Sequence, residues 1–211
     1  MGALLLQLSV TLLLAHLLGD FVFQSDWLVK KKEKIVWLFI HSLIHGILVY
    51  LFLSSWDNWI PPVVITLSHF LIDLIKKLTK KDSLIAFIVD QLMHLLVIVL
   101  LIAFYLIPNA ILPPWVTHLP PYTITVIIHL IAVILLLPVG GILIGYFVYP
   151  FQEQLHKRFR PGSLIPIEGL KDGGKFIGFL ERALIFVFIL SGEFAGVGFL
   201  VAAKSIFRFG E

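Results

Sequence analysis

Residues 3–21 read ALLLQLSVTLLLAHLLGDF, an apolar stretch as long as a membrane helix that contains His16 and Asp20 near its end. Residues four apart lie on one face of a helix, roughly one turn from each other. Later apolar stretches carry further pairs with this spacing: His41/His45, His69/Asp73 and Asp90/His94. An ionisable side chain inside a bilayer costs about 2.5–3.5 kcal/mol on insertion scales. The presence of four such pairs in apolar stretches therefore requires a physical reason.

The whole chain has the composition of a membrane protein. Of its 211 residues 59% are hydrophobic, whereas soluble domains are about 45–50% apolar. The apolar runs extend over roughly 18–28 residues, which is enough to cross a hydrocarbon core of about 30 Å. We therefore expect an all-α polytopic membrane protein with about six transmembrane helices. Their expected positions are 3–28, 35–54, 60–78, 83–107, 122–149 and 176–207.

We expect these helices to form a single transmembrane domain over residues 1–211. Residues 1–107 would form a four-helix bundle, and residues 108–211 would add two helices and a cytoplasmic loop at 150–175. The first helix lacks a preceding basic segment, so we expect it to be retained rather than cleaved as a signal peptide. The sequence Ser-Gly-Glu at 191–193 is a point where the last helix could break into two half-helices.

Lysine and arginine are distributed unequally among the loops. They gather after the first, third and fifth expected helices, whereas the connections 54–60 and 108–121 contain none. Because cytoplasmic loops of polytopic proteins carry an excess of basic residues, we expect the basic loops in the cytoplasm of a bacterial inner membrane. Lys204 and Arg208 depart from this pattern. All four His/Asp pairs then lie about 5–20 Å from the cytoplasmic ends of their helices.

The first two expected hairpins resemble each other. The sequence HLLGD at 16–20 corresponds to HFLID at 69–73, and IHSLIH at 40–45 corresponds to VDQLMH at 89–94. Each hairpin thus contains His-x-x-x-Asp, a lysine-rich loop and a second pair that ends in histidine. The pattern predicts a duplicated hairpin, and two such hairpins predict a four-helix bundle lined by histidine and aspartate.

Histidine and aspartate in this arrangement are typical ligands of transition metals. The chain contains no cysteine, so a metal must be held by imidazole and carboxylate groups. We predict one or two divalent ions, with zinc first and manganese or iron as alternatives. The predicted ligands are His16, Asp20, His41, His45, His69, Asp73, Asp90 and His94. Helix–helix hydrogen bonding, haem ligation and a metal-free proton relay stay open as other roles for these residues.

Further charged and polar residues complete the predicted site. Three carboxylates are candidates for catalysis: Asp20, Asp90 and Glu181. Three side chains are candidates for binding an anionic substrate: Gln24, Lys76 and Arg182. A guanidinium group can bind phosphate or carboxylate through two hydrogen bonds. The alternatives are an ordinary loop lysine for Lys76 and a local ion pair for Glu181 and Arg182.

At these residues the chain resembles a family of small bacterial multi-pass membrane proteins without an assigned activity, the domain of unknown function 3307. The matching motifs are HxxGDxxxQ at 16–24, HxxxHG at 41–46, HxxxDxxK at 69–76, DQxxH at 90–94, IGxxER at 177–182 and GFxxAAKSxxRF at 198–209. The resemblance implies a membrane protein but no activity. In site type alone, the pairs are similar to those of intramembrane zinc hydrolases of the ceramidase and adiponectin-receptor group, and to those of zinc/iron transporters.

The leading hypothesis is an integral-membrane, metal-dependent hydrolase that acts on a lipid-like or phosphorylated substrate at the cytoplasmic leaflet. A divalent-metal or proton-coupled transporter would use the same residues, although transporter sites usually lie near the bilayer midplane between broken helices. A metal-stabilised membrane scaffold with a protein partner is the third hypothesis. Topology accounts for the basic residues, so we expect membrane lipid and no nucleic acid as a partner.

Overall fold

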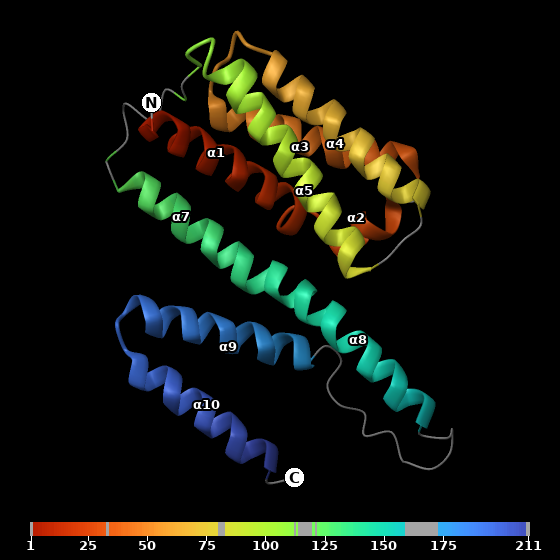
Figure 1. Ribbon diagram of the computed structural model, residues 1–211, viewed down its shortest axis with the longest axis vertical. Helices are drawn as coiled ribbons and strands as arrows, with labels where there is room; N and C mark the ends of the chain where they lie inside the picture. Colours follow the sequence, from red (N-terminus) through yellow and green to blue (C-terminus); the bar gives the residue numbers. More distant parts are fainter. Residues whose placement is uncertain are drawn as a thin grey trace. The chain divides into compact units, whose positions relative to one another are not determined.

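A computed structural model describes residues 2–32, 34–79, 83–111, 113, 120, 122–158 and 173–209. Within these residues the chain is all helical, with no strand (Figure 1). The chain divides into two compact units, Met1–Ile134 and Leu135–Glu211. The expected helical fold class is therefore confirmed.

The described part of the first unit contains six α-helices and one π-helical turn. In chain order they are α1 (Gly2–Phe21), α2 (Asp26–Lys31), α3 (Ile35–Leu53), α4 (Ile60–Thr79), α5 (Leu84–Leu101), η1 (Ile102–Leu106) and α7 (Thr123–Ile134). Helices α1, α3, α4 and α5 form a closed ring of contacts, in which each helix packs against the next and α5 packs against α1. Helix α7 packs against α1. The first half of the chain therefore forms a four-helix bundle, while its origin in a duplicated hairpin stays a prediction.

Four helical segments in the described part are long and apolar enough to cross a membrane. They are Gly2–Phe21, Ile35–Leu53, Leu84–Leu106 and Thr123–Phe151. The sequence predicted about six such helices. The difference arises in the two charged helices, α4 and α9 (Gly173–Leu190), because each carries three charged side chains. The four segments indicate a membrane protein.

Two expected helices are interrupted. The helix expected at 3–28 ends at Phe21, and α2 begins after Ser25, whose hydroxyl accepts a hydrogen bond from the Leu28 backbone N–H at 3.4 Å. A serine in this position is a favourable N-cap, so it starts a new helix. The helix expected at 176–207 is likewise divided between α9 and α10 (Phe194–Phe209). Gly192 between them takes a φ of +75°, which glycine adopts without strain.

An apolar core fills one end of the bundle in the first unit. It contains Leu8, Leu12, Ala15, Leu48, Val49, Leu53, Ile65, Ile98, Leu101, Ile102 and Leu106. In α1 and α4 these residues precede the His/Asp pair, whereas in α3 and α5 they follow it. Because neighbouring helices run in opposite directions, this order gathers all the apolar residues at one level and all the His/Asp pairs at another.

Helices α3 and α4 have the most extensive contact in the bundle, and a glycine permits it. A Cβ atom at Gly46 would lie 2.9 Å from the Pro62 carbonyl oxygen and would overlap the Thr66 hydroxyl. That hydroxyl donates a hydrogen bond to the same carbonyl at 2.8 Å. Close backbone approach at small residues is a common form of packing between membrane helices. It brings the His pair of α3 close to the pair of α4.

The second unit contains η2 (Leu135–Val139), α8 (Gly140–Arg158), α9 and α10. Helix α8 therefore extends into the stretch that was expected to be a loop at 150–175, while residues 159–172 lie outside the described residues. Arg182 in α9 donates a hydrogen bond to the Leu137 carbonyl at 3.1 Å, next to Pro138 in η2. Glu181 forms an ion pair with Lys204 in α10.

Candidate metal centre

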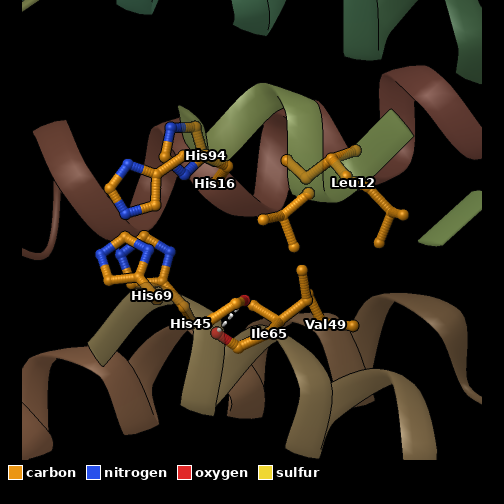
Figure 2. A pocket seen from close by; sticks show the side chains of 10 residues that line it. Leu12, His16, His45, Val49, Ile65, His69 and His94 are labelled. Carbon is orange, nitrogen blue, oxygen red and sulfur yellow. Dashed lines mark hydrogen bonds between the residues drawn. The ribbon is translucent and has the colours of Figure 1, made fainter. Parts of the chain in front are cut away.

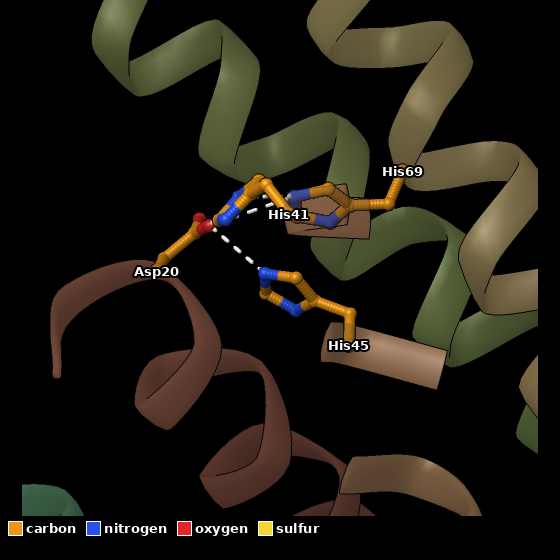
Figure 3. A group of neighbouring side chains, drawn as sticks. All are labelled: Asp20, His41, His45 and His69. Carbon is orange, nitrogen blue, oxygen red and sulfur yellow. Dashed lines mark hydrogen bonds and ion pairs between the residues drawn. The ribbon is translucent and has the colours of Figure 1, made fainter. Parts of the chain in front are cut away.

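Three imidazole rings from two helices surround one carboxylate oxygen of a third. Figure 3 shows Asp20 of α1 facing His41 and His45 of α3 and His69 of α4. The Nε2 atoms of the three histidines lie 3.1, 3.2 and 3.5 Å from Asp20 Oδ1, in that order. The histidine side chains are 0–2% exposed and Asp20 is 9% exposed. Four metal-ligand atoms thus converge inside the bundle.

The distances among these atoms match the size of a metal site. In a tetrahedral zinc site with zinc–nitrogen bonds of about 2.0–2.1 Å, neighbouring ligand atoms lie roughly 3.3 Å apart. His41 Nε2 and His69 Nε2 are 3.1 Å apart, and the three distances to Asp20 fall between 3.1 and 3.5 Å. All the ligand atoms of this group lie within 4.8 Å of one another. The group, which we call the Asp20 cluster, can therefore enclose a small divalent ion with modest side-chain shifts.

The second oxygen of Asp20 is held by an amide. Gln91 Nε2 donates to Asp20 Oδ2 at 3.0 Å, and Gln91 Oε1 lies 3.2 Å from His16 Nε2. His16 itself is 3.6 Å from Asp20 Oδ2. Gln91 therefore orients both side chains beside the Asp20 cluster, as hydrogen bonds to metal-ligating carboxylates commonly do.

A second group of potential ligands shares His69 with the first. His69, Asp73 and His94 also offer ligand atoms within 4.8 Å of one another. In this group Asp73 already has a cationic partner, because Lys32 Nζ donates to its Oδ2 at 2.9 Å. Lys32 also donates to Gln24 Oε1 at 3.0 Å. Lys32 thus balances the charge of Asp73, which leaves the Asp20 cluster as the better metal site.

Removing this lysine is expected to destabilise the bundle. Lys32 is 18% exposed and Asp73 is 9% exposed, so Lys32→Met leaves a largely buried carboxylate without its cation. We expect the free energy of unfolding to fall by about 3 kcal/mol, the lower end of the range for broken buried pairs. Denaturant titration of the protein in detergent measures this change. The control Lys34→Met alters an exposed lysine of the same connection. An equal loss in both variants would contradict the prediction.

His94 has a free ring nitrogen, and its ring packs beside His69 of the Asp20 cluster. Its Nδ1 lies 2.8 Å from the Asp90 backbone carbonyl, which can only accept, so Nδ1 carries a proton. In the neutral ring Nε2 then has the lone pair. This Nε2 is buried and has no hydrogen-bond partner among the described residues. The His94 ring lies 4.0 Å from the His69 ring, centre to centre.

A small cavity lies beside these rings. Its volume is about 10 Å³, close to the smallest space that holds one water. Figure 2 shows His16, His45, His69 and His94 at one end of the cavity and Leu12, Val49 and Ile65 at the other. The cavity therefore offers a position for one water-sized group beside His45, His69 and His94.

The eight predicted ligands are thus brought to one level of the bundle in different roles. Six of them belong to the two groups, and His16 and Asp90 lie beside them. Asp90 accepts a hydrogen bond from Lys76 at 2.7 Å, and its Oδ1 is buried without a partner among the described residues.

Glu181 and Arg182 have their described contacts inside the second unit. Their part in the site stays a prediction.

Gln91 and Lys32 contribute to the site but are not among its predicted ligand, catalytic or substrate-binding residues. An amide in the middle of an apolar helix is a signal that could have identified Gln91. Lys32 gave no such signal, because it belongs to a loop of four lysines within residues 30–34 that membrane topology already explains.

Comparison with known proteins assigns no activity. A family model described as "Protein of unknown function (DUF3307)" matches residues 8–120. This range contains all eight predicted ligands, Gln24, Lys76 and Gln91, and it excludes the motifs at 177–182 and 198–209. No curated protein and no solved structure matches the chain.

Proposed function

Because the chain belongs to a family of unknown function, DUF3307, its chemistry must be inferred from the site, and we propose that it is a metal-dependent membrane hydrolase. The observation that carries the proposal is the Asp20 cluster, in which three imidazole nitrogens surround one carboxylate oxygen at 3.1–3.5 Å. Beside it lie a water-sized cavity and the free Nε2 of His94. A hydrolytic site needs ligands for a metal ion, a position for a water and a general base, and these three features supply them.

The metal would be a divalent ion held by Asp20, His41, His45 and His69. Imidazole and carboxylate ligands suit zinc first, with manganese and iron as alternatives. Structural zinc sites are closed by four protein ligands, whereas catalytic sites keep one position open for water or substrate. The cavity beside His45 and His69 is the feature that favours a catalytic site over a closed structural one.

The reaction would be the hydrolysis of an ester or phosphoester. Asp20, His41, His45 and His69 would hold the ion, which would activate a water for attack on the carbonyl carbon or the phosphorus atom. His94 Nε2 would accept one proton as the water attacks, and it would return that proton to the leaving oxygen as the bond to this oxygen breaks. Lowering the pKa of a bound water toward about 7 is the contribution of the metal. The hydrogen bond from Nδ1 to the Asp90 carbonyl holds the His94 ring in the required tautomer.

The surroundings of the site favour hydrolysis over transport. Metal or proton transport needs polar groups on both sides of the site, along a path across the membrane. On one side of the Asp20 cluster the bundle is filled by leucine, isoleucine, valine and alanine side chains. On the other side lie Lys32 and Lys76, at the ends of helices that lead into basic loops. We place these loops in the cytoplasm, so that substrate and water enter from the cytoplasmic leaflet of a bacterial inner membrane.

The proposal is tested by separating metal binding from hydrolysis. Wild type, His45→Ala and His94→Ala are purified in detergent without chelator, and metal content is measured by plasma mass spectrometry beside hydrolysis of fluorogenic phospholipids. We expect about one equivalent of metal in wild type and in His94→Ala, and its loss in His45→Ala. Hydrolysis should fall at least about 100-fold in both variants.

Two outcomes would overturn the proposal. A metal-free wild type that takes up no added zinc, manganese or iron would remove the metal centre. A metal-loaded wild type that moves metal ions into liposomes and hydrolyses no lipid would replace the hydrolase by a transporter. Metal kept in His45→Ala and lost in His94→Ala would instead place the ion in the group formed by His69, Asp73 and His94.

A further inference from the structure

A long groove runs between α4 and α5 in the first unit. Its volume is about 500 Å³, which lies within the range of roughly 300–1,000 Å³ for small-molecule sites. Its apolar lining includes Ile72, Ile75, Val89 and Met93. An apolar groove on the face of a membrane bundle has the chemistry to hold an acyl chain.

The polar residues of the groove are two hydroxyl groups at its loop end and one ion pair further along it. Thr79 and Ser83 line it where α4 ends and α5 begins, and Lys76 and Asp90 lie further along the helices. Ile72 and Met93 are the lining residues farthest from this end along α4 and α5. The hydroxyl groups thus lie at the loop end of the groove, the ion pair of Lys76 and Asp90 lies further along it, and the rest of the lining is apolar. A lipid with its phosphate at this ion pair would have apolar side chains beside its acyl chain.

Lys76 supplies the cationic group of the groove. Its side chain is 40% exposed, and its Nζ donates to Asp90 Oδ2 at 2.7 Å. An ammonium group on a membrane helix near a basic loop attracts anionic head groups. The ammonium group has three donors, so it can bind a phosphate oxygen while it keeps the bond to Asp90.

We propose that the groove between α4 and α5 binds one anionic phospholipid, with its phosphate at Lys76 and one acyl chain along the apolar lining toward Ile72 and Met93. The occupant is a lipid rather than a free phosphate, because most of the lining is apolar. This inference deepens the proposed function and rests on it for its chemical consequence, since it makes a phospholipid the substrate class.

Hydrogen bonds connect the groove to the candidate metal centre. Gln91 Nε2 lies 3.4 Å from Asp90 Oδ2 and 3.0 Å from Asp20 Oδ2. Lys76, Asp90, Gln91 and Asp20 therefore form a continuous chain from the groove to the Asp20 cluster. Asp90 also holds His94 through its backbone carbonyl. A head group bound at Lys76 would thus lie beside the residues that the hydrolysis proposal uses.

Two pairs of variants test the groove. Lys76→Met removes its cation, while Lys77→Met removes the neighbouring charge, which lies outside the lining. Ala86→Trp fills the groove, while Ile88→Trp places the same side chain at a 43% exposed position of α5 outside the lining. Each protein is extracted from liposomes of phosphatidylglycerol and phosphatidylcholine. Native mass spectrometry then counts the retained lipids, and plasma mass spectrometry measures metal in the same samples.

We expect wild type, Lys77→Met and Ile88→Trp to retain one phosphatidylglycerol. Lys76→Met and Ala86→Trp should retain it at least roughly tenfold more weakly, because each removes a charge-assisted contact or the chain-binding space. Free glycerophosphate should not displace the lipid. Equal retention of phosphatidylcholine, equal loss in Lys76→Met and Lys77→Met, or displacement by glycerophosphate would overturn the inference.

The same samples separate this inference from the proposed function. Metal without lipid retention would overturn the groove as a lipid site and leave the metal centre in place. Lipid retention without metal would overturn the hydrolase and leave the groove in place.

Discussion

Replacing Asp20 with asparagine is expected to lower the affinity of the protein for a divalent metal ion at least about 100-fold. Loss of a residue that only supports a ligand already costs roughly 10–100-fold, and Asp20 is the only carboxylate of the Asp20 cluster. Asn has the same shape, so the Gln91 and histidine side chains keep a partner of similar size. The change removes the negative charge that three imidazole nitrogens face at 3.1–3.5 Å.

Metal titration monitored by plasma mass spectrometry after desalting measures this loss. The matched control is Asp57→Asn, which neutralises an exposed aspartate in the connection between α3 and α4. Circular dichroism shows whether both variants keep the helical fold. If Asp20→Asn binds metal as tightly as Asp57→Asn, the Asp20 cluster is not the metal site.

The substitution Gly19→Ala is expected to weaken metal binding at least about tenfold through one methyl group. A Cβ atom at Gly19 would lie 2.5 Å from Nε2 and 2.6 Å from Nδ1 of His45. Such contacts are too close for any side chain, so the His45 ring must move away from Asp20. The ring is 1% exposed and is surrounded by the other histidines, which leaves it no equivalent position.

The matched control is Gly145→Ala, because a Cβ atom there meets nothing within 4 Å. Both substitutions replace a glycine by an alanine in an apolar helix. Alanine favours the helical conformation by roughly 1 kcal/mol over glycine, so this contribution is the same in both variants. Metal affinity and hydrolysis should fall in Gly19→Ala only. Unchanged affinity in that variant would mean that His45 is dispensable for the site.

The helix pairs show why much of the site is predictable from sequence. The spacing of four residues places His41 and His45 on one face of α3, and His69 and Asp73 on one face of α4. Ionisable side chains in a membrane helix turn away from lipid and toward one another. Helical geometry and the cost of burial were therefore sufficient to predict that the pairs meet.

The division of roles within the cluster was not predictable in this way. His16 and Asp90 have the same spacing to their partners as the other ligands, yet Gln91 and Lys76 engage them beside the metal-ligand groups. Lys32 lies in the connection that precedes α3, and its side chain contacts Asp73, which is 41 residues away along the chain. Such long-range pairings depend on how far each helix is shifted along its neighbour, which no local pattern encodes.

The sequence by itself determined that this chain is a helical membrane protein with histidine and aspartate pairs on its first helices, because hydrophobic length and a spacing of four are local properties of the chain. The tertiary structure decided which of these residues surround one point. The close approach of α1 to the His45 ring at Gly19 and of α3 to α4 at Gly46 sets the relative depth of the helices. That depth brings Asp20, rather than Asp73 or Asp90, to the centre of three imidazole rings.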